Sequence, residues 1–259
     1  MKLAAIGDNC MDVYSTGEAF PGGNPVNVAV YYVRLGGEAS YIGVVGTDGY
    51  GQKMTGAIAS RNVDVSHVIQ TEGRTAVTHV ELVNGDRVFG DYDEGVLAGF
   101  CPTQQQLDFV CEHDIVVTAL WGNVHGELEK IRARGVKVAY DAATRPDSRP
   151  AQTAVSSANY FFFSAKEDTQ ELRERMKALW LQGPELVVAT LGSSGSLAYD
   201  GEKYTPAGIV PCEVVDTLGA GDSYIAGFLK GIAGGKTLEE CMRLGAENAS
   251  VTLSYFGAW

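Results

Sequence analysis

The chain has 259 residues, of which 45% are hydrophobic and 20% are charged, and its formal net charge is −12. This composition supplies enough apolar side chains for a folded core and excludes a disordered chain. The acidic balance disfavours nucleic acids and anionic membranes as partners, because their phosphate groups would be repelled, and no apolar run reaches the length of a membrane-spanning helix.

Cysteine and histidine usage excludes two further classes. The five cysteines are scattered and form no CxxC pair, which excludes a disulfide scaffold and a cysteine zinc site. The four histidines also lack the spacing of metal ligands. The first ten residues, MKLAAIGDNC, read as a buried strand and not as a secretory signal, so we expect a cytoplasmic protein.

Short apolar runs alternate with helical patterns along most of the chain. Strands are predicted over 2–7, 39–46, 114–121, 136–141, 159–164 and 185–192, and their continuous apolar character is typical of parallel strands covered on both faces. Helices are predicted over 25–35, 104–113, 126–135 and 168–183, and another begins at Thr237, which forms a capping box with Glu240. The alternation predicts a three-layer α/β/α sandwich with a mostly parallel central sheet, in one domain over 1–259.

One segment departs from this alternation. Residues 76–83 and 87–92 read as two strands, and Asn84-Gly85 between them is a strong signal for an antiparallel hairpin. An inserted hairpin of this kind often covers a site at the carboxyl edge of a parallel sheet. A hairpin that merely extends one edge of the fold is equally compatible with the pattern.

The segment 216–228, DTLGAGDSYIAGF, is the strongest functional signal in the sequence. A strand is predicted over 211–215, and after Gly221 the apolar residues Ile225, Phe228, Leu229 and Ile232 share one helical face. The free amides of a helix start and the helix dipole attract an anion, and Asp222 in the first turn can take a proton from a hydroxyl beside a phosphoryl group. A glycine turn with a capping aspartate is the alternative interpretation.

Several other catalytic motifs are absent. There is no GxxxxGK[ST] sequence, so the protein is not a P-loop enzyme, and there is no HExxH or GxSxG motif. A dinucleotide fingerprint would need a third glycine at position 224, which is tyrosine. A nicotinamide-dependent oxidoreductase is therefore disfavoured.

The 216–222 segment resembles the DTxGAGD signature of the ribokinase-like sugar kinases, also called the PfkB family. Residues 21–37 (PGGNPVNVAVYYVRLGG) resemble the family's amino-terminal Gly-Gly motif, and 43–51 (GVVGTDGYG) resemble its GxDxxG element. Residues 190–199 (TLGSSGSLAY) resemble its nucleotide-side turn. The resemblance covers most of the chain and implies an enzyme that transfers a phosphoryl group from ATP to a sugar alcohol.

The resemblance also implies roles for individual residues. Asp222 matches the catalytic base, and the anion hole matches Gly219, Ala220 and Gly221. The sugar-side positions match Asp12, Gly22, Gly23, Asn24 and Asn27, and the nucleotide-side positions match Thr190, Gly192, Gly195 and Asn248. The family's Asn-x-x-Glu element corresponds to 164–167, where Ser164 replaces the asparagine and Glu167 is kept, so Glu167 is expected to hold Mg²⁺ through water.

The lid and the cation site are expected to differ from the usual pattern. Only about ten residues separate Asp12 from Gly22, which is too few for a full hairpin by ordinary loop lengths. We therefore expect a small β lid from about 12–21 and 74–97, with its hairpin in the second segment. The resemblance allows a K⁺ ion beside the backbone of Asp216 and Leu218, and it suggests a homodimer through the lid.

Further stretches resemble the family members that act on Amadori products. They are GDNCMDVY, DRVFGDYDEGV and YFGAW. The expected reaction is transfer of the γ-phosphate of Mg·ATP to the 6-hydroxyl of a fructosamine such as fructoselysine. Its secondary ammonium could be attracted by Asp91 together with Asp93 and Glu94, and Arg87 could bind a phosphate or a carboxylate. Asp141, at a predicted strand end, and Arg145 are further pocket candidates.

Other functions remain open at this point. The nearest is a kinase for fructose, ribose or a nucleoside, for which Phe20, Phe89 and Tyr92 could clamp a base. A catalytically silent sugar- or nucleotide-binding regulatory protein is an alternative of another class.

Overall fold

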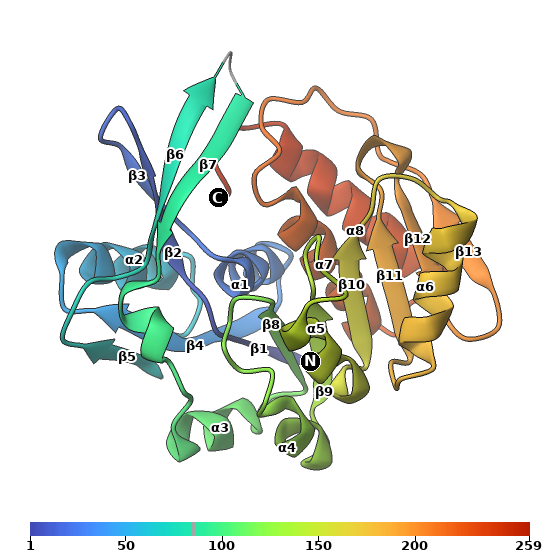
Figure 1. Cartoon of the computed structure of the whole chain (residues 1–259), viewed down its shortest axis with the longest axis horizontal. Coiled ribbons are helices and arrows are strands. Elements are labelled where there is room, and N and C mark those ends of the chain that lie inside the picture. The colour runs from blue at the N-terminus through green and yellow to red at the C-terminus, as the bar shows by residue number, and fades with distance from the viewer. Residues whose placement is uncertain (84–85) are drawn as a thin grey trace.

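A nine-stranded sheet forms the centre of the molecule in the computed structural model (Figure 1), which describes the backbone of 1–83 and 86–259 and the side chains outside 82–89. Its order is β13-β12-β11-β10-β9-β8-β1-β4-β5, and all strands from β11 to β5 are parallel. The bounds are β1 (Lys2–Ile6), β4 (Glu38–Gly46), β5 (Val68–Thr71), β8 (Ile115–Ala119), β9 (Lys137–Asp141), β10 (Tyr160–Ser164), β11 (Leu186–Thr190), β12 (Ser196–Tyr199) and β13 (Tyr204–Ala207). The predicted α/β fold with a mostly parallel sheet is confirmed.

Helices cover both faces of this sheet. They are α1 (Asn24–Arg34), α2 (Gly49–Ser60), α3 (Gln104–Val110), α4 (Leu128–Ala133), α5 (Arg149–Ala154), α6 (Gln170–Trp180), α7 (Ala220–Ala233) and α8 (Leu238–Leu253). On β1, Leu3 and Ala5 belong to the core shared with α1, α2, α7 and α8, whereas Ala4 and Ile6 belong to the core shared with α3 to α6. Alternate residues of a strand point to opposite faces, so a continuously apolar strand serves both cores.

A second, four-stranded sheet in the order β3-β2-β6-β7 stands away from the central sheet and is called the lid sheet below (Figure 1). Its strands are β2 (Cys10–Tyr14), β3 (Ala19–Gly22), β6 (Val77–Val83) and β7 (Asp86–Asp93). The expectation that the first segment is too short for a hairpin is wrong. β2 and β3 pair antiparallel because their turn is tight, with the Tyr14 amide donating to Glu18 O at 2.8 Å. Asn84-Gly85 lies outside the described residues.

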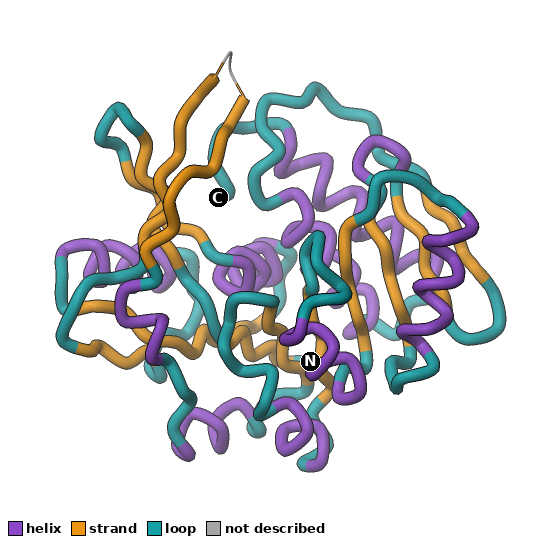
Figure 2. The backbone as a smooth tube through the Cα atoms, viewed as in Figure 1, coloured by secondary structure: helices purple, strands orange, loops and turns teal. Residues whose placement is uncertain are grey.

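The segment before α7 also differs from its prediction. Residues 211–215 form no strand, and they lie in a long loop over 208–219 that leads from β13 to α7 (Figure 2). Val214 and Val215 are 60% and 55% exposed, so their apolar side chains do not mark a buried strand. The antiparallel strands β12 and β13 form that edge of the sheet and were not predicted.

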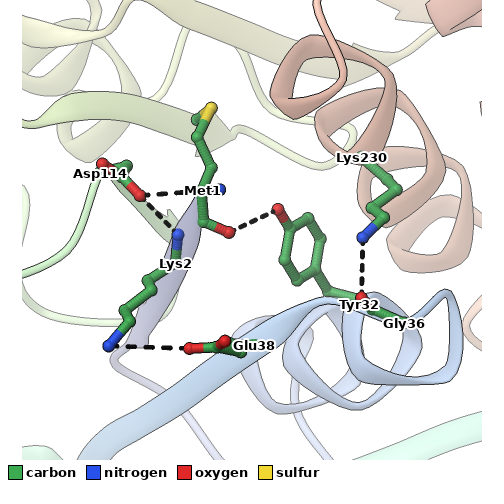
Figure 3. Close-up of polar contacts among 7 residues, drawn as sticks. All are labelled: Met1, Lys2, Tyr32, Gly36, Glu38, Asp114 and Lys230. Carbon is green, nitrogen blue, oxygen red and sulfur yellow. Dashed lines mark hydrogen bonds and ion pairs between the residues drawn. The ribbon is translucent and has the colours of Figure 1, made fainter.

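Polar contacts tie elements together near the amino ends of β1 and β8 (Figure 3). The Lys2 amide donates to Asp114 Oδ2 at 2.6 Å, and the Tyr32 hydroxyl donates to Met1 O at 3.1 Å. Lys230 of α7 donates to Gly36 O at 2.9 Å, just beyond the end of α1. These contacts join β1 to α1 and α1 to α7. They hold together one strand and two helices whose opposite ends carry the candidate functional residues.

The predicted capping box at the start of α8 is confirmed, because the Thr237 hydroxyl accepts from the Glu240 amide and the Glu240 carboxylate accepts from the Thr237 amide. Among the described residues, no helix combines the length and the apolar character needed to span a membrane.

Candidate active site

A cavity of about 470 Å³ lies between the lid sheet and the carboxyl ends of the central strands. Its walls are formed by the segment between β1 and α1, the first turns of α1, the lid sheet, the loops after β8 and β9, and the start of α7. They include Asp8, Cys10, Asp12, Gly23, Asn24, Asn27, Thr78, Gly90, Tyr92, Trp121, Arg145, Leu218 and Asp222. Strand order reverses beside β1, since β4 and β8 flank it on opposite sides, and such a switch point is where open α/β sheets bind ligands.

The start of α7 carries unoccupied backbone amides beside this cavity, which Leu218 and Asp222 line. Gly219 caps the helix in the left-handed conformation (φ 72°), and the Ala220 amide donates to Thr217 O at 3.3 Å. Within the described part of the chain, no hydrogen bond occupies the amides of Gly221 and Asp222. A Cβ added to Gly221 would meet no atom within 4 Å. The helix start therefore has the free donors and the space that an anion requires.

Asp222 is buried, and asparagines of α1 hold both of its carboxylate oxygens. Asn24 donates its side-chain amide to Asp222 Oδ1 and also to Asp141 Oδ2, the latter at 2.8 Å. Asn27 donates to Asp222 Oδ2 at 2.7 Å. The indole N–H of Trp259 donates to Asn27 Oδ1 at 2.8 Å, which orients the Asn27 amide so that its nitrogen faces the carboxylate. The side chain of Asp222 is thus fixed within the cavity wall.

Three buried acids lie together here, because Asp8 and Asp222 line the cavity and Asp141 shares the Asn24 side chain with Asp222. Burial raises the pKa of each. For Asp222 the pKa lies well above its usual value, first because of burial and then because of the negative charge of Asp141. Burial raises the pKa of Asp141 to about 6 and that of Asp8 to about 7. A carboxyl group with a raised pKa binds a hydroxyl proton more strongly and is a better general base near neutral pH.

The predicted sugar-side residues gather in the same place. Asp12 of β2 lines the cavity, and a Cβ added to Gly22 would lie 3.0 Å from Asp12 Oδ2. Gly23 precedes α1 with a φ of 110°, and a Cβ there would lie 2.7 Å from Asn9 Cα. Only glycine allows α1 to begin this close to the loop after β1. Asn24 and Asn27 project from the first turns of α1.

The predicted nucleotide-side residues lie along the ends of β10 and β11. The hydroxyls of Ser164 and Thr190 are 2.9 Å apart, Glu167 is exposed, and Gly192 and Gly195 form the turn into β12. Asn248 of α8 is buried with both ends of its amide in use. It accepts from Arg34 and donates to Ser223 O, each at 2.7 Å. The nucleotide contacts of these residues stay predictions.

The carboxylate of Asp216 organises the loop before α7. It accepts from the Leu218 amide at 3.1 Å and from the Gly257 amide at 2.8 Å, so residues near 257 reach the segment for which a K⁺ ion was predicted. Among the described residues, no group of three or more histidine, cysteine, aspartate or glutamate side chains could hold a metal ion alone.

Two lid candidates are not brought into the cavity. Asp91 is exposed and does not line it, whereas Gly90 and Tyr92 do, because successive side chains of a strand point to opposite faces. Asp93 instead accepts from the Gly95 amide at 3.0 Å and caps the turn after β7. The side chain of Arg87 lies outside the described residues.

The structure adds residues that the sequence interpretation missed, namely Asp8, Thr78 and Trp121. Asp8 follows the end of β1 by two residues, and Trp121 follows the end of β8 by the same number. Both therefore lie at carboxyl ends of parallel strands, which is the rule that identified Asp141. Thr78 lies in the lid sheet, and no sequence signal distinguishes it.

Comparison with solved structures supports the fold. A ribokinase of Arabidopsis thaliana complexed with ribose and ATP superposes with a TM-score of 0.88 at 22% identity, covering 99% of this chain and 93% of that one. An uncharacterized sugar kinase of Pyrococcus horikoshii superposes with a TM-score of 0.83 at 26% identity, covering 100% and 94%.

Sequence relatives extend over nearly the whole chain. It is 44% identical over 258 residues to a fructoselysine 6-kinase of Shigella flexneri, with 99% of each chain covered. It is 32% identical over 265 residues to a fructosamine kinase of Bacillus subtilis (strain 168), covering 100% of this chain and 93% of the relative. Residues 5–259 match the pfkB family carbohydrate kinases. Together with the cavity at the start of α7, these matches show that the chain belongs to the pfkB family of carbohydrate kinases, which use ATP as the phosphoryl donor.

Proposed function

We propose that this protein transfers the γ-phosphate of ATP to the 6-hydroxyl of a fructosamine, with fructoselysine as the first substrate to test. The observation that carries the proposal is the position of Asp222, buried in the cavity wall beside the unoccupied amides of α7. The relatives named fructoselysine 6-kinase and fructosamine kinase support the choice of substrate.

In this proposal Asp222 orients the attacking hydroxyl and accepts its proton. Asn24 and Asn27 hold the carboxylate in one orientation, so little reorganisation is needed when the alcohol arrives. The amides of Gly221 and Asp222 face the position where negative charge accumulates on the transferring phosphoryl group. The lid sheet covers the cavity and limits the access of water, which would compete with the sugar as acceptor.

The residues at the nucleotide side fit a magnesium ion that is held mainly by the phosphates. Mg²⁺ is usually bound by one or two carboxylates together with substrate oxygens and water. Glu167 is exposed, and within the described residues no hydrogen bond or ion pair engages it, so its carboxylate is free for this purpose. When bound, the ion neutralises charge on the phosphates. A K⁺ site near Asp216, a homodimer through the lid sheet and a cytoplasmic location stay proposals.

A kinase for free fructose is the second candidate, because a fructokinase of Salmonella typhimurium is 30% identical over 259 residues. The nucleoside alternative has less support, since Phe20 packs against the ring of Tyr14 at 5.6 Å and does not line the cavity.

The decisive experiment is incubation with Mg·ATP and fructoselysine, glucoselysine or fructose, followed by mass identification of the phosphorylated product. We expect ADP release and a monophosphate ester at the 6-position of fructoselysine. A higher kcat/KM for fructose would favour the fructokinase alternative, and no ADP release with any sugar would favour the catalytically silent binding protein.

A further inference from the structure

One buried carboxylate oxygen in the cavity wall has no partner. Asp8 lies between β1 and β2 and is 6% exposed. Its Oδ2 accepts from the Asn24 amide at 3.2 Å, but its Oδ1 has no hydrogen-bond partner within the described part of the chain. Leaving a buried carboxylate oxygen unpaired is costly, so this atom is expected to have a partner in the complex with substrate.

The neighbouring acids do not share this feature. Asp141 accepts from Asn24 through Oδ2 and from the Ala143 amide through Oδ1, and Asp222 accepts from Asn24 and Asn27. Asn24 contacts Asp8 with its backbone amide and Asp222 with its side chain. One residue therefore connects the carboxyl group that has the unpaired oxygen to the proposed general base. A single bound sugar can therefore face both carboxyl groups.

Aromatic side chains line the same cavity. Trp121, from the loop after β8, is 40% exposed, and Tyr92, from the lid sheet, is 39% exposed. Large aromatic surfaces that remain open in a cavity are suited to contact with a ligand, and the face of an indole or phenol ring attracts a cation. A carboxylate combined with two aromatic rings is the chemistry that recognises an organic ammonium group.

We propose that Asp8, Trp121 and Tyr92 form the subsite for the secondary ammonium group that a fructosamine carries on C1. This inference rests on the proposed function and assigns the part of the site that separates a fructosamine from a neutral sugar. It replaces the lid acids Asp91 and Asp93, which do not line the cavity, as the origin of that selectivity.

The first test compares fructoselysine with fructose, which lacks the ammonium group. In Asp8→Asn the side chain keeps its size and its acceptor for the Asn24 amide but loses the negative charge. We expect the ratio of kcat/KM for fructoselysine to kcat/KM for fructose to fall at least tenfold, mainly through a higher KM for fructoselysine. The matched control is Glu81→Gln, which removes an exposed acid from the lid sheet and should leave this ratio within twofold.

A second pair of variants keeps the inference testable if Asp8→Asn does not fold, as judged by its melting temperature. Trp121→Leu removes the aromatic face and should lower the same ratio, whereas Trp121→Phe should restore most of it. An unchanged ratio in folded Asp8→Asn, or equal ratios in the two Trp121 variants, would overturn the subsite while the kinase activity stands. Wild-type protein that phosphorylates fructose but no fructosamine would instead overturn the proposed function and, with it, this inference.

Discussion

At the residue scale, Asp222 combines two properties that a general base requires. Its orientation is fixed by amides from Asn24 and Asn27, and burial raises its pKa toward the range in which it can accept a proton and release it again. Asp222 also lies in the first turn of α7, where the helix amides can hold the phosphoryl group that the hydroxyl attacks.

We therefore expect Asp222→Ala to lower kcat by roughly two to four orders of magnitude, which is the usual contribution of a positioned base. Affinity for ATP should be nearly unchanged, because the proposed nucleotide contacts lie at the ends of β10 and β11. Steady-state kinetics and a direct ATP titration would measure the two effects. Retention of most of the turnover would remove Asp222 from the mechanism.

Gly221 allows a test of the proposed anion site without damage to the fold. Since a Cβ at this position meets no atom within 4 Å, Gly221→Val should leave the melting temperature nearly unchanged while its side chain fills the space in front of the helix amides. We expect a fall in kcat of at least about tenfold for valine and a smaller fall for alanine. Turnover of Gly221→Val at the wild-type rate would contradict the placement of the phosphoryl group.

At the element scale, local patterns predicted the parts of the fold that depend on local interactions. Continuous apolar runs identified the parallel strands other than β5, and the Thr237–Glu240 capping box identified the start of α8. The glycines and the acid of 219–222 identified the start of α7. Each of these signals has its physical cause within a few residues of the chain.

The errors arose where pairing with a distant segment decides the structure. Residues 10–22 form a hairpin that also pairs with β6, and only the folded chain brings β6 beside it. Residues 211–215 were predicted as a strand but pair with no other strand. Asp8 was missed although it follows a predicted strand, because its importance lies in an unpaired oxygen that only the three-dimensional contacts reveal.

The junction between the lid sheet and α1 depends on one glycine. Gly23→Ala would place a Cβ 2.7 Å from Asn9 Cα with φ at 110°, so we expect a loss of stability of about 2–4 kcal/mol together with reduced kcat, since Asn24 would shift. Gly36→Ala is the matched control, because its φ of 74° is also positive but its Cβ would meet no atom within 4 Å. Chemical denaturation of the two variants would measure the difference, and equal losses would show that close approach is unimportant.

At the scale of the whole molecule, the cluster of acids opposes folding at neutral pH. The pKa values of Asp8 and Asp141, about 7 and about 6, exceed the usual value of 3.8, so the folded state binds more protons than the unfolded state between about pH 4 and 7. Stability therefore decreases as the pH rises through this window.

We expect the melting temperature of the ligand-free protein to fall as the pH rises from 5 to 8. The slope should be smaller in Asp8→Asn, which has no carboxyl group to ionise at that position. Acids with lowered pKa, such as Asp48 and Asp168, titrate below this window and should not affect the comparison. A melting temperature that rises over the same interval would contradict the raised pKa values.

The connections of the lid sheet have a mechanical consequence. β2 begins four residues after the end of β1, and α1 begins two residues after the end of β3, so the connecting segments 7–9 and 23 are short. One connection contains Asp8, the other precedes Asn24, and Gly23 packs closely against Asn9 where the two meet. A substrate that engages both residues would hold both connections at once, so that the position of the lid sheet depends on whether an acceptor is bound.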